Sequence, residues 1–128
     1  MSRFITVQIE GVEYSLFFSV LAMEKIYDEF GNMQGMMSAI QEEKNPARQF
    51  SKILDVLTYE NIAALELMKL EGETGPAIDK KRLLASMNPF EVDASAYWLK
   101  ALEVINVGQE RSVEVESKNA EATPEETL

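Results

Sequence analysis

Hydrophobic and polar residues alternate with a period of two over the first part of the chain. In an extended strand, this alternation places the apolar side chains on one face. Glu10-Gly11 separates two such runs and predicts a tight turn, because glycine readily adopts a positive φ. We therefore predict a β-hairpin over residues 4–18. Its apolar positions are Ile5, Val7, Ile9, Val12, Tyr14, Leu16 and Phe18.

After this hairpin, the apolar residues recur every three or four positions, which is the spacing of one face of an α-helix. A first helix is predicted between a Ser19 cap and a stop at Gly31. Its expected buried stripe is Val20, Met23, Tyr27 and Phe30. Asn32 predicts the cap of a second helix, which Gly35 weakens by up to about 1 kcal/mol relative to alanine. The apolar positions of that helix are Met33, Met36, Met37 and Ile40.

A third helical stretch follows Asn45-Pro46, where asparagine caps the helix and proline occupies its first position. Apolar residues then recur at helical spacing to about Leu70, and the pattern fits either one long helix or two joined near Thr58. Residues 71–76 contain two glycines and a proline, which predicts a loop.

Two further helices are predicted in the last part of the chain. Asp79 caps a short helix that buries three apolar residues, namely Leu83, Leu84 and Met87. Asn88-Pro89 predicts the start of the last helix, and Gly108 its end. The apolar side of that helix is Ala94, Tyr97, Trp98, Ala101, Leu102 and Ile105. Residues 109–128 hold six glutamates and no aromatic residue, and they predict a disordered acidic tail.

Together these elements predict an α+β, predominantly helical fold. An N-terminal β-hairpin is followed by about five helices packed as a small orthogonal bundle. The expected organisation is a single globular domain over residues 1–108, with the hairpin at 4–18 and the helices at about 19–107, followed by the tail at 109–128. A chain of 128 residues is long enough to bury a core without disulfides.

The absence of histidine and cysteine removes most familiar catalytic schemes. Ser–His and Cys–His nucleophiles are excluded, as are zinc–thiolate sites. No phosphate-binding glycine motif is present. Carboxylate pairs such as Glu42-Glu43, Glu71-Glu73 and Asp28-Glu29 lack the spacing of an EF-hand loop and are interpreted as solvated faces. We therefore predict a protein that is not an enzyme and has no cofactor and no metal site.

The net charge is −10, from 22 acidic and 12 basic residues. Such a balance disfavours binding to nucleic-acid phosphates and to anionic membrane surfaces. The sequence has no apolar run of membrane-spanning length, and its first residues lack the layout of a signal peptide. These features predict a soluble, cytoplasmic protein with protein partners rather than a nucleic acid or a membrane.

The apolar residues offer a candidate partner-binding surface. Methionine is flexible and polarisable, so it fills irregular cores and also serves surfaces that adapt to several partners. Aromatic residues are common anchors in interfaces. Both roles, core and surface, are open for the candidate residues. They are Met33, Met36, Met37, Ile40, Tyr97 and Trp98.

The order of the elements over residues 5–40 resembles a known family. The hairpin sequence Ile-Thr-Val-Gln-Ile-Glu-Gly-Val-Glu-Tyr-Ser-Leu at 5–16 leads into the helical sequence Ala-Met-Glu-Lys-Ile-Tyr-Asp-Glu-Phe-Gly at 22–31. This arrangement is similar to the tail assembly chaperones of siphophages and of prophages. The resemblance implies a protein of the host bacterial cytoplasm that coats the phage tape-measure protein, recruits tail-tube subunits and self-associates. It assigns no individual functional residue.

An alternative hypothesis is an acidic phage- or prophage-encoded regulatory or inhibitory binding protein, including a mimic of nucleic-acid charge. A mimic requires its acidic residues to be ordered on one face. The two hypotheses therefore differ in where the carboxylates lie in the fold.

Overall fold

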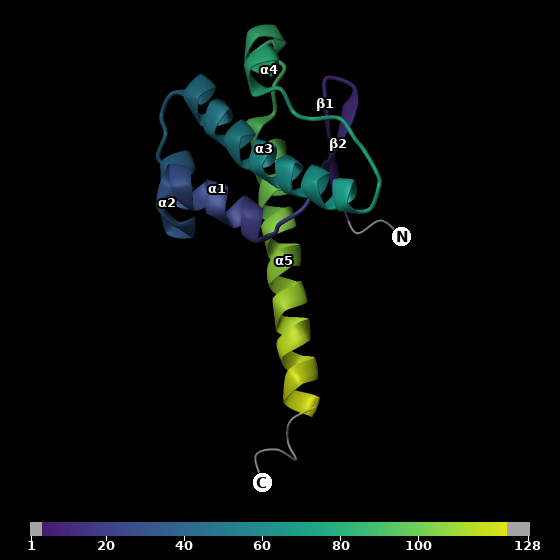
Figure 1. Ribbon diagram of the computed structural model, residues 1–128. Helices are drawn as coiled ribbons and strands as arrows, with labels where there is room; N and C mark the ends of the chain where they lie inside the picture. Colours follow the sequence, from purple (N-terminus) through teal and green to yellow (C-terminus); the bar gives the residue numbers. More distant parts are fainter. Residues whose placement is uncertain (1–3, 123–128) are drawn as a thin grey trace.

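The computed structural model describes the backbone of residues 4–122 and the side chains of residues 4–111. The described chain begins with an antiparallel hairpin of β1 (Ile5–Ile9) and β2 (Val12–Leu16). Helices then follow, as Figure 1 shows: α1 (Val20–Phe30), α2 (Met33–Gln41), α3 (Pro46–Leu70), α4 (Lys80–Ser86) and α5 (Ala94–Ala122). The predicted α+β, predominantly helical fold is confirmed. Among the described helices, none has an uncharged, strongly hydrophobic stretch of the length that a membrane-spanning segment requires.

The hairpin forms where the alternation predicts it. Glu10 and Gly11 both have positive φ, at 51° and 79°, as a two-residue turn of type I′ requires. In this register Val7 pairs with Tyr14, and both side chains are buried on the same face of the sheet. A two-stranded sheet is marginal by itself in water. Here β2 packs against α3 and β1 against α5, so the apolar face is covered.

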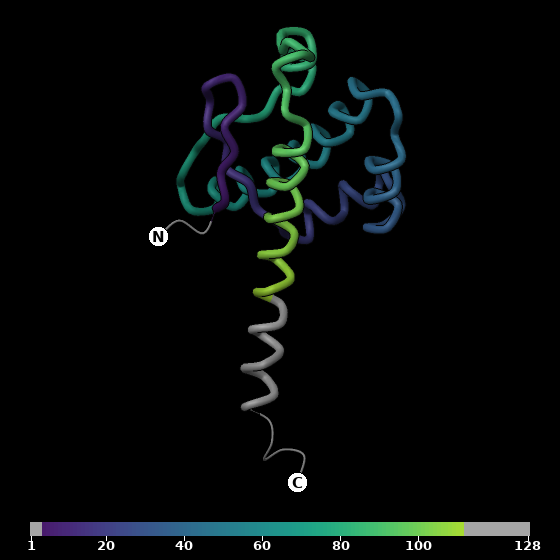
Figure 2. The backbone as a smooth tube through the Cα atoms, turned by 180° about the vertical axis from the view of Figure 1, so that it is seen from behind, coloured from purple at the N-terminus to yellow at the C-terminus, as the bar shows by residue number. Residues whose placement is uncertain are grey.

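Helix α3 is the centre of the protein, because it contacts β2 and each of the other four described helices. Seen from behind in Figure 2, α5 crosses α3. The 25-residue α3 is one helix, which resolves the choice between one helix and two. Thr58 does not cap a new helix, since its hydroxyl donates to the Leu54 carbonyl one turn earlier, at 2.6 Å. The predicted start is confirmed, with Asn45 Oδ1 accepting from two backbone N–H groups at the helix start.

The first helix buries a different face from the one predicted. Ala22 and Ile26 are buried and the predicted Phe30 packs against the core, whereas Val20, Met23 and Tyr27 are exposed. Helical spacing alone does not show which of the two faces is buried, because each face carries a pair of apolar residues four positions apart.

Gly35 lets α2 pack closely against the end of α1. A Cβ at this position would lie 2.2 Å from the backbone oxygen of Phe30. Asn32 caps α2 as predicted, with its side-chain oxygen 2.6 Å from the Gly35 nitrogen. The glycine that weakens the isolated helix is therefore required by the tertiary contact.

The last helix begins later than predicted, at Ala94 rather than next to Asn88-Pro89. Residues 88–91 form a turn instead, in which the Glu91 N–H donates to the Asn88 carbonyl at 3.0 Å. The Asp93 carboxylate supplies the cap, accepting from the Ala96 N–H at 3.2 Å. Asn88-Pro89 and Asp93 carry comparable capping signals, and the local sequence does not show at which of them the helix begins.

The predicted helix end at Gly108 is wrong, because α5 continues to Ala122. Gly108 does not adopt the positive φ of a helix stop. A Cβ there would lie 2.9 Å from the Phe18 ring, so the glycine allows that ring to pack closely on α5. The predicted disordered tail at 109–128 is thus helical as far as 122, and residues 123–128 lie outside the described residues.

One turn after Gly108, Arg111 holds the segment that joins β2 to α1. Its guanidinium donates to the Phe18 carbonyl at 2.7 Å and lies 4.3 Å from the centre of the Phe17 ring. A hydrogen bond from a charged donor contributes more to the stability of the fold than one from a neutral donor, and the cation–π contact adds to that stability.

We predict that a chain ending at residue 111 melts at the same temperature as the full chain, because it keeps these contacts. A chain ending at 108 loses Arg111 and is expected to be less stable by about 1–2 kcal/mol. Thermal unfolding of both truncations and of Arg111→Ala tests this expectation. Equal loss of stability in the two truncations would show that residues 112–128 contribute to the fold.

Candidate protein-interaction surfaces

The structure divides the predicted partner residues of α2 between the core and its margin. Met36 and Ile40 are buried, with 0% and 1% of their surface exposed, so they are not available to a partner. Met33 and Met37 are half-buried and pack against the core. The prediction of a binding surface at Met36 and Ile40 is therefore wrong, and their spacing reflects the core-facing side of α2.

Tyr97 and Trp98 connect α5 to the helices beneath it. The Tyr97 ring lies 5.5 Å from the Phe50 ring, centre to centre. Trp98 borders a small hollow with Ile40 and Ile53. Both aromatic residues are half-buried, and we interpret them as contacts between helices.

The exposed side of α1 carries a row of apolar residues. Val20 is 84% exposed, Met23 37% and Tyr27 41%. Their spacing places them along one face of α1, and we call this row the α1 stripe. Glu24 and Asp28, each one position later, are exposed beside it. The sequence identified these apolar residues but assigned them to the core.

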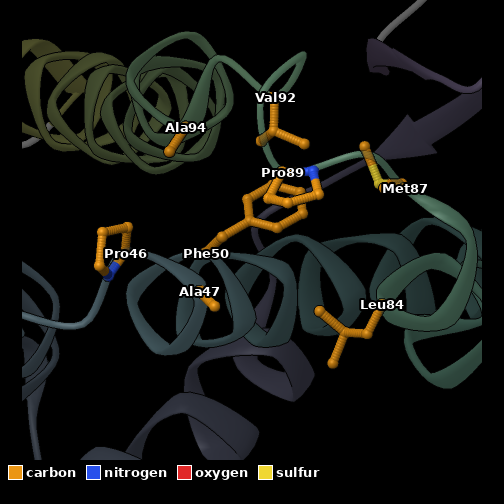
Figure 3. A pocket seen from close by; sticks show the side chains of 8 residues that line it. All are labelled: Pro46, Ala47, Phe50, Leu84, Met87, Pro89, Val92 and Ala94. Carbon is orange, nitrogen blue, oxygen red and sulfur yellow. The ribbon is translucent and has the colours of Figure 1, made fainter.

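A second apolar feature is a groove with a cavity volume of about 240 Å³. Its walls come from the start of α3, from α4, from the linker between α4 and α5, and from the start of α5. Figure 3 shows the lining side chains: Pro46, Ala47, Phe50, Leu84, Met87, Pro89, Val92 and Ala94. Leu84 was predicted to be buried but is 43% exposed at this site. Sequence reasoning missed the groove because its walls are far apart along the chain.

Phe90 stands beside this groove with 96% of its surface exposed. The turn at residues 88–91 holds it there, since Asn88 Oδ1 accepts from the Phe90 N–H at 3.0 Å. Pro89 and Val92, on either side in sequence, line the groove. An aromatic residue exposed to this extent is unusual for a side chain that contributes only to packing.

A polar network links α1, α3 and α4. The Tyr59 hydroxyl donates to Glu29 Oε1, and Lys80 pairs with Asp55 at 2.5 Å. Burial raises the pKa of Glu29, and a hydrogen bond with Asp55 raises it further. Burial likewise raises the pKa of Tyr59, and its hydrogen bond to Glu29 adds to this effect. Tyr59 therefore stays protonated, and its hydrogen bond to the Glu29 carboxylate joins α3 to α1.

Two polar residues of α3 are buried side by side, and only one has hydrogen-bond partners for its side chain. Asn61 donates to the Ser15 carbonyl at 2.9 Å and to the Pro76 carbonyl at 3.3 Å. Its carbonyl oxygen accepts from the Ile78 N–H at 2.8 Å. Both carboxyl oxygens of Glu60, by contrast, are buried without a hydrogen-bond partner. Burial raises the pKa of Glu60 well above its ordinary value.

The α1 stripe and the groove lie on separate parts of the molecule. Figures 1 and 2 place α4 at one end and α1 on the other side of α3. Exposed apolar rows and apolar grooves are both typical of sites that bind side chains of another polypeptide. In the described chain, no three acidic side chains converge in a way that holds a metal ion. Comparisons of the chain with family models, with curated proteins and with solved structures give no match.

Proposed function

We propose that this chain is a phage tail assembly chaperone that binds the tape-measure protein and tail-tube subunits in the host bacterial cytoplasm. The observation that supports this proposal most is the α1 stripe. An α-helix that leaves an apolar row in water, next to a core already complete on its other face, is suited to receive an apolar row from another helix.

The chemistry of the stripe fits a helical client. The three side chains cover two turns of α1, which matches the spacing at which an amphipathic helix presents its own anchors. Met23 adds adaptability, because its flexible side chain repacks around different neighbours. A net charge of −10 keeps a complex of chaperone and client dispersed in solution.

The alternative, an acidic mimic of nucleic acid, requires carboxylates gathered on one face. The described acidic residues are spread over the hairpin, α1, the linker between α2 and α3, α3, the loop after it, the linkers on both sides of α4, and α5. Figure 1 places these segments in different parts of the molecule. Their distribution therefore does not favour the mimic over the chaperone.

Met23→Asp is expected to weaken client binding by about tenfold or more, because a charge then faces the apolar client. Unfolding free energy should change by less than about 0.5 kcal/mol, as is usual for exposed positions. The measurement is co-expression with a siphophage tape-measure protein, followed by the soluble fraction of that protein and its recovery in complex.

The matched control is Leu99→Asp, the same chemical change at a residue of α5 that is 66% exposed. This variant should keep the client soluble as well as the natural chain does. Equal loss of the client with both variants, or no loss with Met23→Asp, would contradict the α1 stripe as the client site.

A further inference from the structure

We infer that two copies of this chain associate through the groove, each inserting Phe90 into the groove of the other. This inference goes beyond the proposed function and concerns residues outside the α1 stripe. It rests on a projecting aromatic side chain and a matching apolar recess that lie next to each other on one chain.

The recess has the size and chemistry for a phenyl ring. A cavity of about 150 Å³ with apolar walls is enough to bind benzene, and the groove has about 240 Å³. Its walls are formed by proline, alanine, leucine, valine, methionine and phenylalanine side chains. Such a site offers an aromatic ring apolar contact on several sides.

Phe90 is placed beside its own groove without entering it. Pro89 and Val92 already occupy the wall next to it, and the turn at 88–91 aims the ring outward. The ring therefore has apolar surface to bury, and the groove has space to receive it. Because the two lie side by side, a twofold axis next to the turn places each ring over the groove of the other copy. Such a contact is self-complementary and closes at two copies.

The charges around the two features are complementary as well. Glu91 and Asp93, both exposed, follow Phe90 in sequence. The exposed Lys81 lies one turn before the groove residue Leu84 on α4. The N-terminus of α3, whose first residues line the groove, adds a partial positive charge. The acidic segment that carries the ring thus meets Lys81 and this helix N-terminus on the other copy, although the chain as a whole is strongly acidic.

The proposed partner is a second copy rather than an unrelated protein, because the chain supplies both halves of the contact. At physiological ionic strength, charges more than about 8 Å apart are largely screened. Screening therefore reduces the repulsion between the net charges of the two copies.

Sedimentation equilibrium of the full chain, from micromolar to millimolar concentration, tests this inference. The natural chain is expected to move from 14.4 kDa toward twice that mass as its concentration rises. Phe90→Asp should raise the dissociation constant at least about 30-fold, as for a central aromatic anchor. Its melting temperature as a monomer should be unchanged, since the side chain is 96% exposed.

Two further variants make the result specific. Ala47→Trp fills the groove while keeping Phe90, and it should also weaken association. An equal mixture of Phe90→Asp and Ala47→Trp restores one intact ring-and-groove contact, so it should form a mixed pair more readily than either variant pairs with itself. Met23→Asp should dimerise like the natural chain.

A natural chain that stays monomeric throughout would overturn the inference, and so would a dimer that Phe90→Asp leaves intact. Failure of the mixture to pair would exclude the reciprocal insertion. If Ala47→Trp instead releases the client and leaves the mass unchanged, the groove receives a client side chain and not a second copy. The dimerisation outcomes do not bear on Met23→Asp, so the client proposal stands or falls separately.

Discussion

Met36→Asp is expected to unfold the protein or to lower its unfolding free energy by about 4 kcal/mol or more. Met36 is 0% exposed and belongs to the core cluster between the helices. Aspartate at this position loses the apolar contacts of methionine and buries a charge without a partner, and either effect alone costs several kcal/mol. The unfolding free energy of a natural domain is only about 5–15 kcal/mol in total. Urea unfolding followed by far-UV circular dichroism measures the loss.

Met36→Leu is the matched control, because it conserves volume and should cost less than about 1.5 kcal/mol. Met23→Asp provides the second comparison, since it introduces the same charge on the α1 stripe. If Met36→Asp were as stable as Met23→Asp, Met36 would have to be accessible, and α2 rather than α1 would be the surface to consider.

Glu60→Met is expected to raise the unfolding free energy at neutral pH by about 1–3 kcal/mol, which is the usual cost of a buried polar group without a hydrogen bond. Glu60 is 0% exposed, and neither carboxyl oxygen has a partner. Methionine has a side chain of similar length and no polar group to desolvate. Chemical denaturation of the natural chain and of the variant at several pH values measures the difference.

The pH dependence of this effect has a definite sign. Burial raises the pKa of Glu60 above its ordinary value of 4.5, so between 4.5 and the pKa of the folded state, the native protein holds a proton that the unfolded chain has lost. The stability contributed by this group therefore falls as pH rises through that window, and it is constant below and above it. The raised pKa of Glu29 acts in the same direction. The increase in unfolding free energy that Glu60→Met produces should accordingly become larger as pH rises from 4.5.

Glu60→Gln separates the charge from the polarity, since it removes the titration but keeps an unpaired polar group. It should flatten the pH dependence and stabilise the protein less than methionine does. Asn61→Leu, one residue later, should destabilise the protein by about 2–4 kcal/mol, because it leaves the Ile78 N–H and the Ser15 carbonyl unpaired. Destabilisation by Glu60→Met would show that the carboxyl has a partner, such as a buried water.

Much of the local structure was predictable because its causes are local. The Glu10-Gly11 turn, the Asn32 cap and the Asn45-Pro46 start each depend on residues within one turn of the chain. The alternation over the hairpin determined the buried face of the sheet, since an error of one residue would expose Val7 and Tyr14 together. The loop after α3 was equally clear from its glycines and proline.

The candidate surfaces were not predictable in the same way. An apolar row at helical spacing shows that one face of a helix is apolar, but it does not say whether another element covers that face. On α2 the row became core, whereas on α1 the smaller face of Ala22 and Ile26 was buried and the larger one was left exposed. The groove required residues of α3, α4 and α5 to meet, and no local pattern contains that information.

Gly11 and Gly108 illustrate this difference between local and tertiary causes. At Gly11 the residue is required by a positive φ, which the turn sequence already implies. At Gly108 it is required by the Phe18 ring, ninety residues earlier in the chain, which packs where a Cβ would otherwise lie. The sequence by itself determined the hairpin, the helical content and the absence of histidine and thiol chemistry, because these depend on residue type and short-range spacing. Only the tertiary structure decided which apolar residues are buried, where α5 begins and ends, and which side chains remain free to bind another chain, because these depend on contacts between distant segments.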